Sequence, residues 1–230
     1  GGLGEIGRNC TVFEFGDDAV IVDCGVMFPD SDMPGVDLVL PDFSYVTENA
    51  DRFRGIVITH CHEDHIGGIP YLLRELNLPI YGTKLTLGLI SSRLKEHGLL
   101  DSAMLHEVRH GEAIRFGQIE IETFHVCHSI PDGMGVVLRT PAGMVVHTGD
   151  FKFDHTPVND LPPDFQTLAR LGSEGVLALL CDSTYADRPG YTPSEQEIYS
   201  SFDNIFADAP GRIIVSTFAS LISRIQQIVD

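Results

Sequence analysis

The first part of the chain is predicted to begin with a β-hairpin. Residues 10–16 (CTVFEFG) and 19–25 (AVIVDCG) alternate or run apolar, and a short polar turn with glycine lies between them. This pattern is typical of two strands joined by a tight connection. Residues 54–60 (RGIVITH) form a short apolar run rich in β-branched side chains, which predicts a buried strand.

Helices and further strands follow in alternation. Residues 66–76 and 83–98 have apolar positions at helical spacing, and Gly98 is expected to cap the second helix. Residues 118–128 (QIEIETFHVCH) alternate as a strand does, and residues 134–150 (MGVVLRTPAGMVVHTGD) predict another hairpin.

The last quarter of the chain begins with an apolar strand, residues 175–184 (GVLALLCDST). Residues 185–193 (YADRPGYTP) are rich in turn formers and are the best candidate for a domain boundary. Thr192-Pro193-Ser194-Glu195 resembles a capping box and predicts a helix directly after it. Residues 211–217 (GRIIVST) are then expected to be a strand and residues 219–230 a helix. The whole pattern indicates a mixed α/β fold with two sheets covered by helices.

Composition narrows the class of protein. The 230 residues are 43% hydrophobic and 21% charged, which suits one or two folded domains. No apolar run approaches the roughly 20 residues of a membrane span, and no signal peptide is recognisable. The chain opens on GGLGEIGRN without Met, which suggests a piece of a longer protein. The five cysteines are odd in number and form no CxxC pair, so a reducing cytoplasm is expected.

Six consecutive residues, His60 to His65, hold three histidines and two acids. His60 and His62 lie two residues apart at a strand end, where period-two geometry points both side chains to one face. Asp64 and His65 follow as the chain turns into a helix. Two imidazoles can therefore bind one cation, while a carboxylate and a third imidazole bind a second; this donor set suits zinc, manganese or iron.

Two other strand ends carry the donors that this cluster lacks. His128 ends one predicted strand, and Asp150 follows another in a Gly-bearing loop. We expect His128 to complete a three-nitrogen site and Asp150 to bridge the two cations. Cys61 and Cys127 alternate away from the neighbouring ligands and are predicted to be small buried hydrophobes. The other histidines are expected to be ordinary surface or structural residues.

These motifs resemble the metallo-β-lactamase superfamily and, within it, the ribonuclease J family. THCHEDHIGG (59–68), IVDCG (21–25), HSIPD (128–132) and HTGD (147–150) match the superfamily in order and at strand ends. GGLGEIGRN (1–9), DFKFD (150–154), CDSTYADRPGYTPSE (181–195) and STFAS (216–220) resemble ribonuclease J more specifically. The resemblance covers essentially the whole chain.

The resemblance implies an αββα metallo-β-lactamase sandwich for residues 1–193 and the beginning of an inserted β-CASP α/β domain for residues 194–230. It implies that His60, His62 and His128 hold one zinc ion, that Asp64 and His65 hold the other, and that Asp150 bridges them. Three further residues receive a role from the family. Asp182 is either a catalytic residue that orients a water or leaving group or a hydrogen-bond anchor, and Asp23 either supports the site from behind or is a structural turn residue. Ser220 is a substrate contact.

The resemblance also implies the activity. It is metal-dependent hydrolysis of RNA, 5′→3′ exonucleolytic with some endonucleolytic cleavage, with two zinc ions activating a water and manganese or magnesium as substitutes. The implied partners are 5′-monophosphorylated single-stranded RNA, a homodimer or homotetramer, and other RNA-decay proteins. The formal net charge of −18 argues against a basic nucleic-acid groove, but two divalent cations would outweigh the two ligand carboxylates and make the pocket locally positive.

Three alternatives remain open. One is a thioester or lactam hydrolase of the same fold, which would lack the inserted domain. Another is a flavo-diiron-type oxidoreductase, where Glu usually replaces His62. The third is a non-catalytic β-CASP scaffold module. The chain also departs from the family in two places: Leu221-Ile222-Ser223 stands where Asn and His are expected after STFAS, and Cys61 stands where Gly is common.

Overall fold

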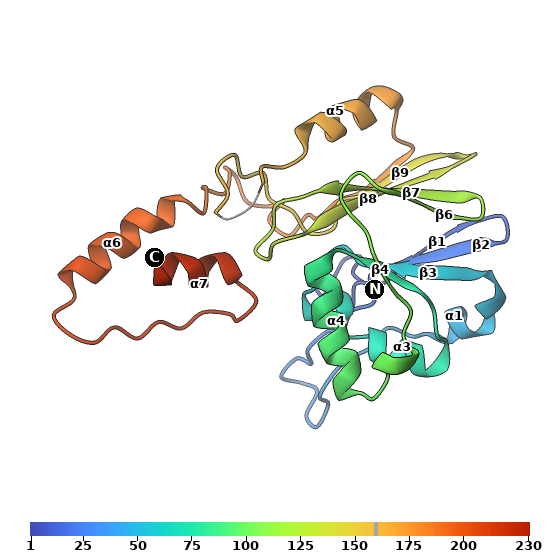
Figure 1. Ribbon diagram of the computed structural model, residues 1–230, viewed down its shortest axis with the longest axis horizontal. Helices are drawn as coiled ribbons and strands as arrows, with labels where there is room; N and C mark the ends of the chain where they lie inside the picture. The colour runs from blue at the N-terminus through green and yellow to red at the C-terminus, as the bar shows by residue number, and fades with distance from the viewer. Residues whose placement is uncertain (159–160) are drawn as a thin grey trace.

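Two β-sheets pack face to face, and helices cover both outer surfaces (Figure 1). The computed structural model describes residues 1–158 and 161–230. In the described residues each sheet has five strands, in the orders β1-β2-β3-β4-β5 and β10-β9-β8-β7-β6. The strands of the first sheet are β1 Thr11–Phe15, β2 Asp18–Val22, β3 Phe53–Val57, β4 Ile80–Gly82 and β5 Leu105–Glu107. Those of the second are β6 Ala113–Phe116, β7 Ile119–His125, β8 Met134–Thr140, β9 Gly143–His147 and β10 Ala178–Leu180.

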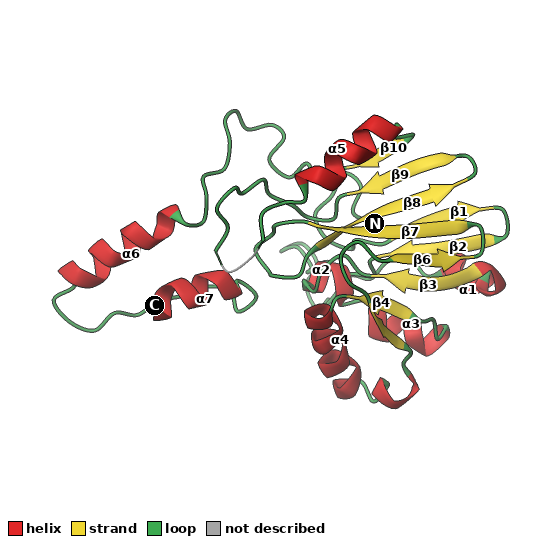
Figure 2. Ribbon diagram, turned by 45° about the horizontal axis from the view of Figure 1, so that its top comes forward, coloured by secondary structure: helices red, strands yellow, loops and turns green. Residues whose placement is uncertain are grey.

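The helices divide into three groups by position (Figures 1 and 2). Helices α1 (Ser44–Glu48), α3 (Ile69–Glu75) and α4 (Lys84–Glu96) lie on the first sheet, and α5 (Phe165–Glu174) lies on the second. The short α2 (Glu63–Ile66) follows β3 at the end of the first sheet. Helices α6 (Glu197–Asp208) and α7 (Ile222–Val229) lie outside the two-sheet body.

Strand alternation explains the four layers. In β2 and β3, Ile21 and Ile56 face the helices of the first sheet, whereas Val20, Val22 and Val57 face the second sheet. In the second sheet, Val136 and Leu138 of β8 meet those valines. Val137, between them, packs outward with Leu171 of α5. Because successive side chains of a strand point to opposite faces, both faces of each sheet are buried, and the predicted αββα sandwich is confirmed.

The strand directions bring several strand ends to one edge of the sandwich. Strands β2, β3 and β4 run parallel, so the loops after β2 and β3 leave from the same edge of the first sheet. Strand β8 is antiparallel to both β7 and β9, and β10 is parallel to β9. The ends of β7, β9 and β10 therefore also lie together. The Thr59 carbonyl accepts a hydrogen bond from the Met134 amide at 2.9 Å, which joins the two sheets at this edge.

Both predicted hairpins are confirmed. Strands β1 and β2 pair from Thr11↔Val22 to Phe15↔Asp18, and β8 and β9 pair antiparallel across their turn. The predicted helix over residues 83–98 is α4, and Gly98 just beyond it has a φ of +70°, the left-handed conformation that glycine adopts at low cost.

Two predictions for the last quarter are wrong. Residues 211–217 form no strand, because in the described chain no neighbouring strand pairs with their backbone, and Ile214 is 88% exposed. The helix expected after Glu195 is confirmed as α6, but the capping box is wrong as its start, since α6 begins only at Glu197 and has no side-chain cap hydrogen bond. Ser194 and Glu195 are bound elsewhere: the Ser194 hydroxyl donates to the Thr156 carbonyl at 2.9 Å, and the Glu195 amide donates to Asp154 Oδ2 at 2.9 Å.

The domain boundary at residue 193 stays a prediction. Its position agrees with the point where the chain leaves the two-sheet body, since residues 185–193 are exposed throughout. Among the described residues, none of the helices combines the length and apolar character needed to cross a membrane.

Candidate metal centre

The predicted ligands all lie in loops that follow strands at one edge of the sandwich. His60 and His62 come directly after β3, and Asp64 and His65 lie in α2. His128 follows β7 and Asp150 follows β9, both in the second sheet. The two sheets thus each contribute part of the site, and the six side chains are brought together as two overlapping groups.

The first group consists of three histidines and one carboxylate: His60, His62, His128 and Asp150, with donor atoms within 4.8 Å of one another. His60 Nε2 lies 3.0 Å from His62 Nδ1, and His128 Nε2 lies 3.1 Å from the same atom. The three ring nitrogens therefore lie close together, two from the loop after β3 and one from the loop after β7.

The second group consists of Asp64, His65 and Asp150, again within 4.8 Å. His65 Nε2 lies 3.5 Å from Asp64 Oδ2 and 3.4 Å from Asp150 Oδ1. His65 is 2% exposed, whereas the Asp64 side chain is 32% exposed, so one ligand is fixed inside the protein and the other borders the cavity.

Asp150 divides its carboxylate between the two groups. Its Oδ1 faces His65, while its Oδ2 lies 3.6 Å from His128 Nε2 and 3.9 Å from His60 Nε2. A carboxylate with one oxygen toward each group has the geometry of a bridge between two cations. The bridging role predicted for Asp150 from its position in the sequence is compatible with the different neighbours of its two oxygens.

The two groups differ in their protonation. Burial lowers the pKa of His60 well below its usual range, and burial, opposed in part by Asp150, lowers that of His128 to about 4. Burial also opposes the charge of His65, but Asp23 and Asp150 outweigh it and raise its pKa to about 10 in the metal-free protein. Neutral imidazoles therefore face the first position, and a cation at the second would displace a proton from His65.

Asp23 holds His65 from behind. Its Oδ2 lies 2.8 Å from His65 Nδ1, so the neutral imidazole that binds a cation would keep its proton on Nδ1 and present the Nε2 lone pair to the site. The carboxylate also accepts hydrogen bonds from the Thr59 amide (2.8 Å) and hydroxyl (2.8 Å). The side chain is 1% exposed, and its backbone has a φ of 61°. Of the two interpretations left open from the sequence, support behind the site fits these contacts.

The backbone beside α2 is packed without free space. The Cys24 amide donates to the His65 carbonyl at 2.8 Å, and the Val26 amide donates to the Glu63 carbonyl at 3.2 Å. Between them, a Cβ on Gly25 would lie 1.6 Å from the Asp64 carbonyl oxygen. Only glycine at position 25 allows the backbone of Asp64 and His65 to pack this closely against the loop after β2.

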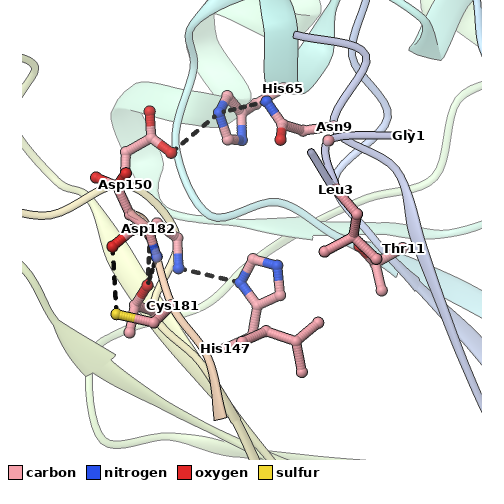
Figure 3. A pocket seen from close by; sticks show the side chains of 13 residues that line it. Gly1, Leu3, Asn9, Thr11, His65, His147, Asp150, Cys181 and Asp182 are labelled. Carbon is pink, nitrogen blue, oxygen red and sulfur yellow. Dashed lines mark hydrogen bonds and ion pairs between the residues drawn. The ribbon is translucent and has the colours of Figure 1, made fainter. Parts of the chain in front are cut away.

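The two carboxylates of the ligand groups, Asp64 and Asp150, line an open cavity of about 370 Å³. Residues 2–7 and Asp182 to Thr184 also line it. A smaller adjoining cavity is drawn in Figure 3, where Asn9, His65 and Asp150 line one side and His147 lies opposite.

The donor set fits divalent cations on physical grounds. Four imidazole rings and two carboxylates converge, and ring nitrogens 3.0 and 3.1 Å apart are close enough to share one cation. Nitrogen and oxygen donors of this kind suit zinc or manganese. Neither Cys61 nor Cys127 belongs to a group; both are buried, and the Cys127 thiol donates to the Leu161 carbonyl at 3.0 Å.

Comparison with known proteins assigns the fold to a family. The model of the metallo-β-lactamase superfamily matches residues 3–215. The chain belongs to the metallo-β-lactamase superfamily.

Its relatives in that superfamily include ribonuclease J proteins. The chain is 50% identical to ribonuclease J 1 of Streptococcus pyogenes over 99% of its length, and 48% identical to ribonuclease J of Thermus thermophilus over 100%. It spans 40% and 41% of those two proteins, respectively. A crystal structure of a protein of unknown function from Enterococcus faecalis V583 superposes with a TM-score of 0.68 at 18% identity, over 97% of this chain and 60% of that one, and so supports the fold alone.

Asp182 of this metallo-β-lactamase protein lies beside the site, but its carboxylate is engaged. Oδ1 accepts hydrogen bonds from the Thr184 amide (2.9 Å) and hydroxyl (2.7 Å), and Oδ2 lies 3.5 Å from the Phe151 amide. These contacts fit the anchoring alternative, and a catalytic role stays a prediction. Ser220 lies in the turn before α7, outside the described lining of both cavities, so its substrate contact stays a prediction too.

Sequence reasoning missed two residues that contact the site. His147 was expected to be ordinary, yet its Nδ1 accepts a hydrogen bond from the Gly149 amide at 3.0 Å, within the turn that carries Asp150. Asn9 was considered only as part of a motif, yet its carboxamide lies 3.2 Å from Asp64 Oδ2 and contacts His65, the second contact being drawn in Figure 3. The signal for His147 was its position three residues before a predicted ligand, and the signal for Asn9 was a Gly-rich segment ending in a polar residue just before a strand.

Proposed function

We propose that this protein is a ribonuclease that hydrolyses RNA phosphodiester bonds with two divalent cations, zinc in the first place and manganese or magnesium as substitutes. The proposed cleavage is 5′→3′ exonucleolytic with some endonucleolytic activity. The observation that carries the proposal is Asp150, whose two oxygens face two separate ligand groups. The similarity to ribonuclease J proteins along the whole chain supports RNA as the substrate.

The residues of the chain have distinct tasks in this reaction. When bound, two divalent cations lower the pKa of a water and neutralise charge on the phosphodiester. His60, His62 and His128 would hold one cation, Asp64 and His65 the other, and Asp150 both. Asp23 keeps the Nδ1 proton of His65 and so turns the lone pair of Nε2 toward the cation.

The distribution of charge over the protein favours binding of an anionic substrate at the metal site rather than elsewhere on the surface. The protein carries a formal net charge of −18, which repels a polyanion at long range. Divalent cations would reverse this sign locally in the cavity beside Asp64 and Asp150. We expect the substrate to be single-stranded RNA with a 5′-monophosphate, and the protein to act in the cytoplasm as a homodimer or homotetramer with other RNA-decay proteins.

The test is cleavage of a 5′-monophosphorylated RNA by the complete natural chain and by His62→Ala. We expect the variant to lose at least about 100-fold in single-turnover rate, because removing a metal ligand removes the ion that organises the reaction. The His62 side chain is only partly buried, so the thermal unfolding midpoint should change little.

The matched control is His106→Ala, which removes an exposed imidazole that stacks on Tyr81, with ring centroids 4.8 Å apart, in the first sheet. This control should cleave RNA at the wild-type rate. Near-wild-type cleavage by His62→Ala would contradict the proposed function.

A further inference from the structure

We propose that Asn9 is a positioning residue that orients the Asp64 carboxylate for the second cation. The inference rests on the proposed function and adds a residue outside the six ligands. Asn9 ends the Gly-rich segment that precedes β1, and its side chain is directed at the second ligand group (Figure 3). Its Nδ2 lies 3.2 Å from Asp64 Oδ2 and 3.0 Å from His65 Nε2.

Both groups that contact Asn9 Nδ2 are hydrogen-bond acceptors when Asp64 is ionised and His65 is neutral, which are the forms that bind a cation. The Asp64 carboxylate offers only lone pairs, and His65 offers a lone pair on Nε2 when its proton lies on Nδ1 beside Asp23. The carboxamide NH₂ is therefore the group that faces the ligands. Once a cation takes the Nε2 lone pair, the hydrogen bond to Asp64 is the one that remains, because a carboxylate has lone pairs for both a cation and a donor.

The oxygen of the Asn9 carboxamide lies close to Gly2. A Cβ on Gly2 would lie 2.4 Å from Asn9 Oδ1, and Gly2 has a φ of +88°. The amide oxygen thus occupies the space that a side chain at position 2 would fill, which leaves the nitrogen directed at Asp64.

The backbone of Asn9 is anchored to the same elements. Its amide donates to the Asp64 carbonyl at 3.0 Å, and its carbonyl accepts from the Gly25 amide at 2.8 Å. The base of the side chain is therefore placed relative to α2 by main-chain hydrogen bonds, which a substitution at position 9 retains. The effect of such a substitution should come from the carboxamide alone.

The two ligands of the second group depend on Asn9 to different degrees. His65 is held by Asp23 and is almost completely buried. Within the described residues, Asn9 is the side chain that donates a hydrogen bond to the partly exposed Asp64 carboxylate. Without Asn9 the Asp64 carboxylate can rotate into the cavity. We therefore expect a loss confined to the second cation, of roughly 10-fold to 100-fold in affinity, as is usual for partners of metal ligands.

The experiment is titration of the metal-free complete chain with Zn²⁺ against a chromophoric chelator, which resolves two dissociation constants. Asn9→Ala should weaken the second constant at least about tenfold and leave the first within about twofold. Asn9→Leu, which keeps the volume but donates no hydrogen bond, should behave in the same way. Asn77→Ala is the matched control, since it removes one Asn hydrogen bond, to the Ser102 carbonyl at 2.9 Å, far from the site.

The outcomes separate the two proposals. A wild-type chain that takes up no second ion overturns the two-cation function and this inference with it. A wild-type chain that binds two ions, with Asn9→Ala binding both at unchanged affinity, overturns this inference alone. Full affinity in Asn9→Leu but not in Asn9→Ala would show that packing, not the hydrogen bond, is what matters, and would also overturn it.

Discussion

The two-sheet body and the segment from residue 185 onward contain similar apolar runs, but these runs are buried in the body and largely exposed in the segment. In the body, strands β2 and β3 are buried on both faces, and Ile56 and Val57 are fully buried. In the segment, Tyr191, Ile214 and Phe218 are more than 80% exposed, and Gln227 is the one buried residue of α6 and α7. An apolar run becomes a strand only where a neighbouring strand takes its backbone hydrogen bonds and another layer covers its side chains.

The connection between the two regions is polar. Glu195 binds Lys152 of the body at 3.0 Å and Arg224 of α7 at 2.6 Å. The Gln227 side-chain Nε2 donates to the Glu195 backbone carbonyl at 2.7 Å. Lys152 lies two residues after Asp150, so this network joins α7 to the loop that leaves the site. The charged side chains of this network are 19% to 32% exposed, whereas the apolar contacts inside the body are buried.

The largest expected effect comes from Gly25→Ala in the body. The added Cβ would meet the Asp64 backbone at 1.6 Å, where no side-chain rotation can relieve it. We expect a loss of more than about 3 kcal/mol in the free energy of unfolding.

Gly172→Ala in α5 is the opposite case, because its Cβ would meet no atom within 4 Å. That variant should gain about 0.5–1 kcal/mol through helix propensity. Urea unfolding of both variants tests the pair, and equal stabilities would contradict the packing described around α2.

The next effect compares one isoleucine in each region. Ile58→Ala removes a fully buried side chain from the core beneath the helices and should cost about 3 kcal/mol. Ile214→Ala removes a side chain that is 88% exposed and should stay within about 0.5 kcal/mol. A cost at Ile214 as large as at Ile58 would show that the segment is packed in solution, and would remove the contrast between the regions.

The smallest effect concerns the polar connection. Glu195→Gln should weaken the ion pairs with Lys152 and Arg224, each worth up to about 1 kcal/mol at this exposure. Amide hydrogen exchange in α7 should accelerate severalfold, while β2, β3 and β8 remain protected.

Glu197→Gln is the control, because Glu197 makes no ion pair with the described residues. Unchanged exchange in α7 of Glu195→Gln would show that the network does not hold this helix.

Much of the body was predictable because each element carried its own local signal. Alternation in residues 10–25 and 134–150 gave period-two faces, and helical spacing predicted α4. The strand at 211–217 and the helix start at Thr192 could not be predicted correctly, because both depended on partners distant in sequence. Ser194 and Glu195 bind Thr156 and Asp154, about 40 residues earlier, and no local pattern shows this.

The site was predictable to a different degree. Strand-end positions and the H-x-H-x-D-H spacing were enough to name six donors, which the structure brings together. The division of the two Asp150 oxygens required the relative placement of the two sheets. Asn9 could not be derived, because its carboxamide contacts residues 55 and 56 positions further along the chain. Asp23 received its supporting role only from the family resemblance, and the contact with His65 that fits this role spans 42 residues.

The most direct test of the central claim is the metal content of the complete natural chain. Purified protein should be loaded with zinc, desalted and measured by elemental analysis beside His62→Ala and Asp64→Ala. The two ligand groups that share Asp150 predict close to two ions per wild-type chain and a lower content in each variant. One ion or none per wild-type chain, with the variants unchanged, would contradict the account.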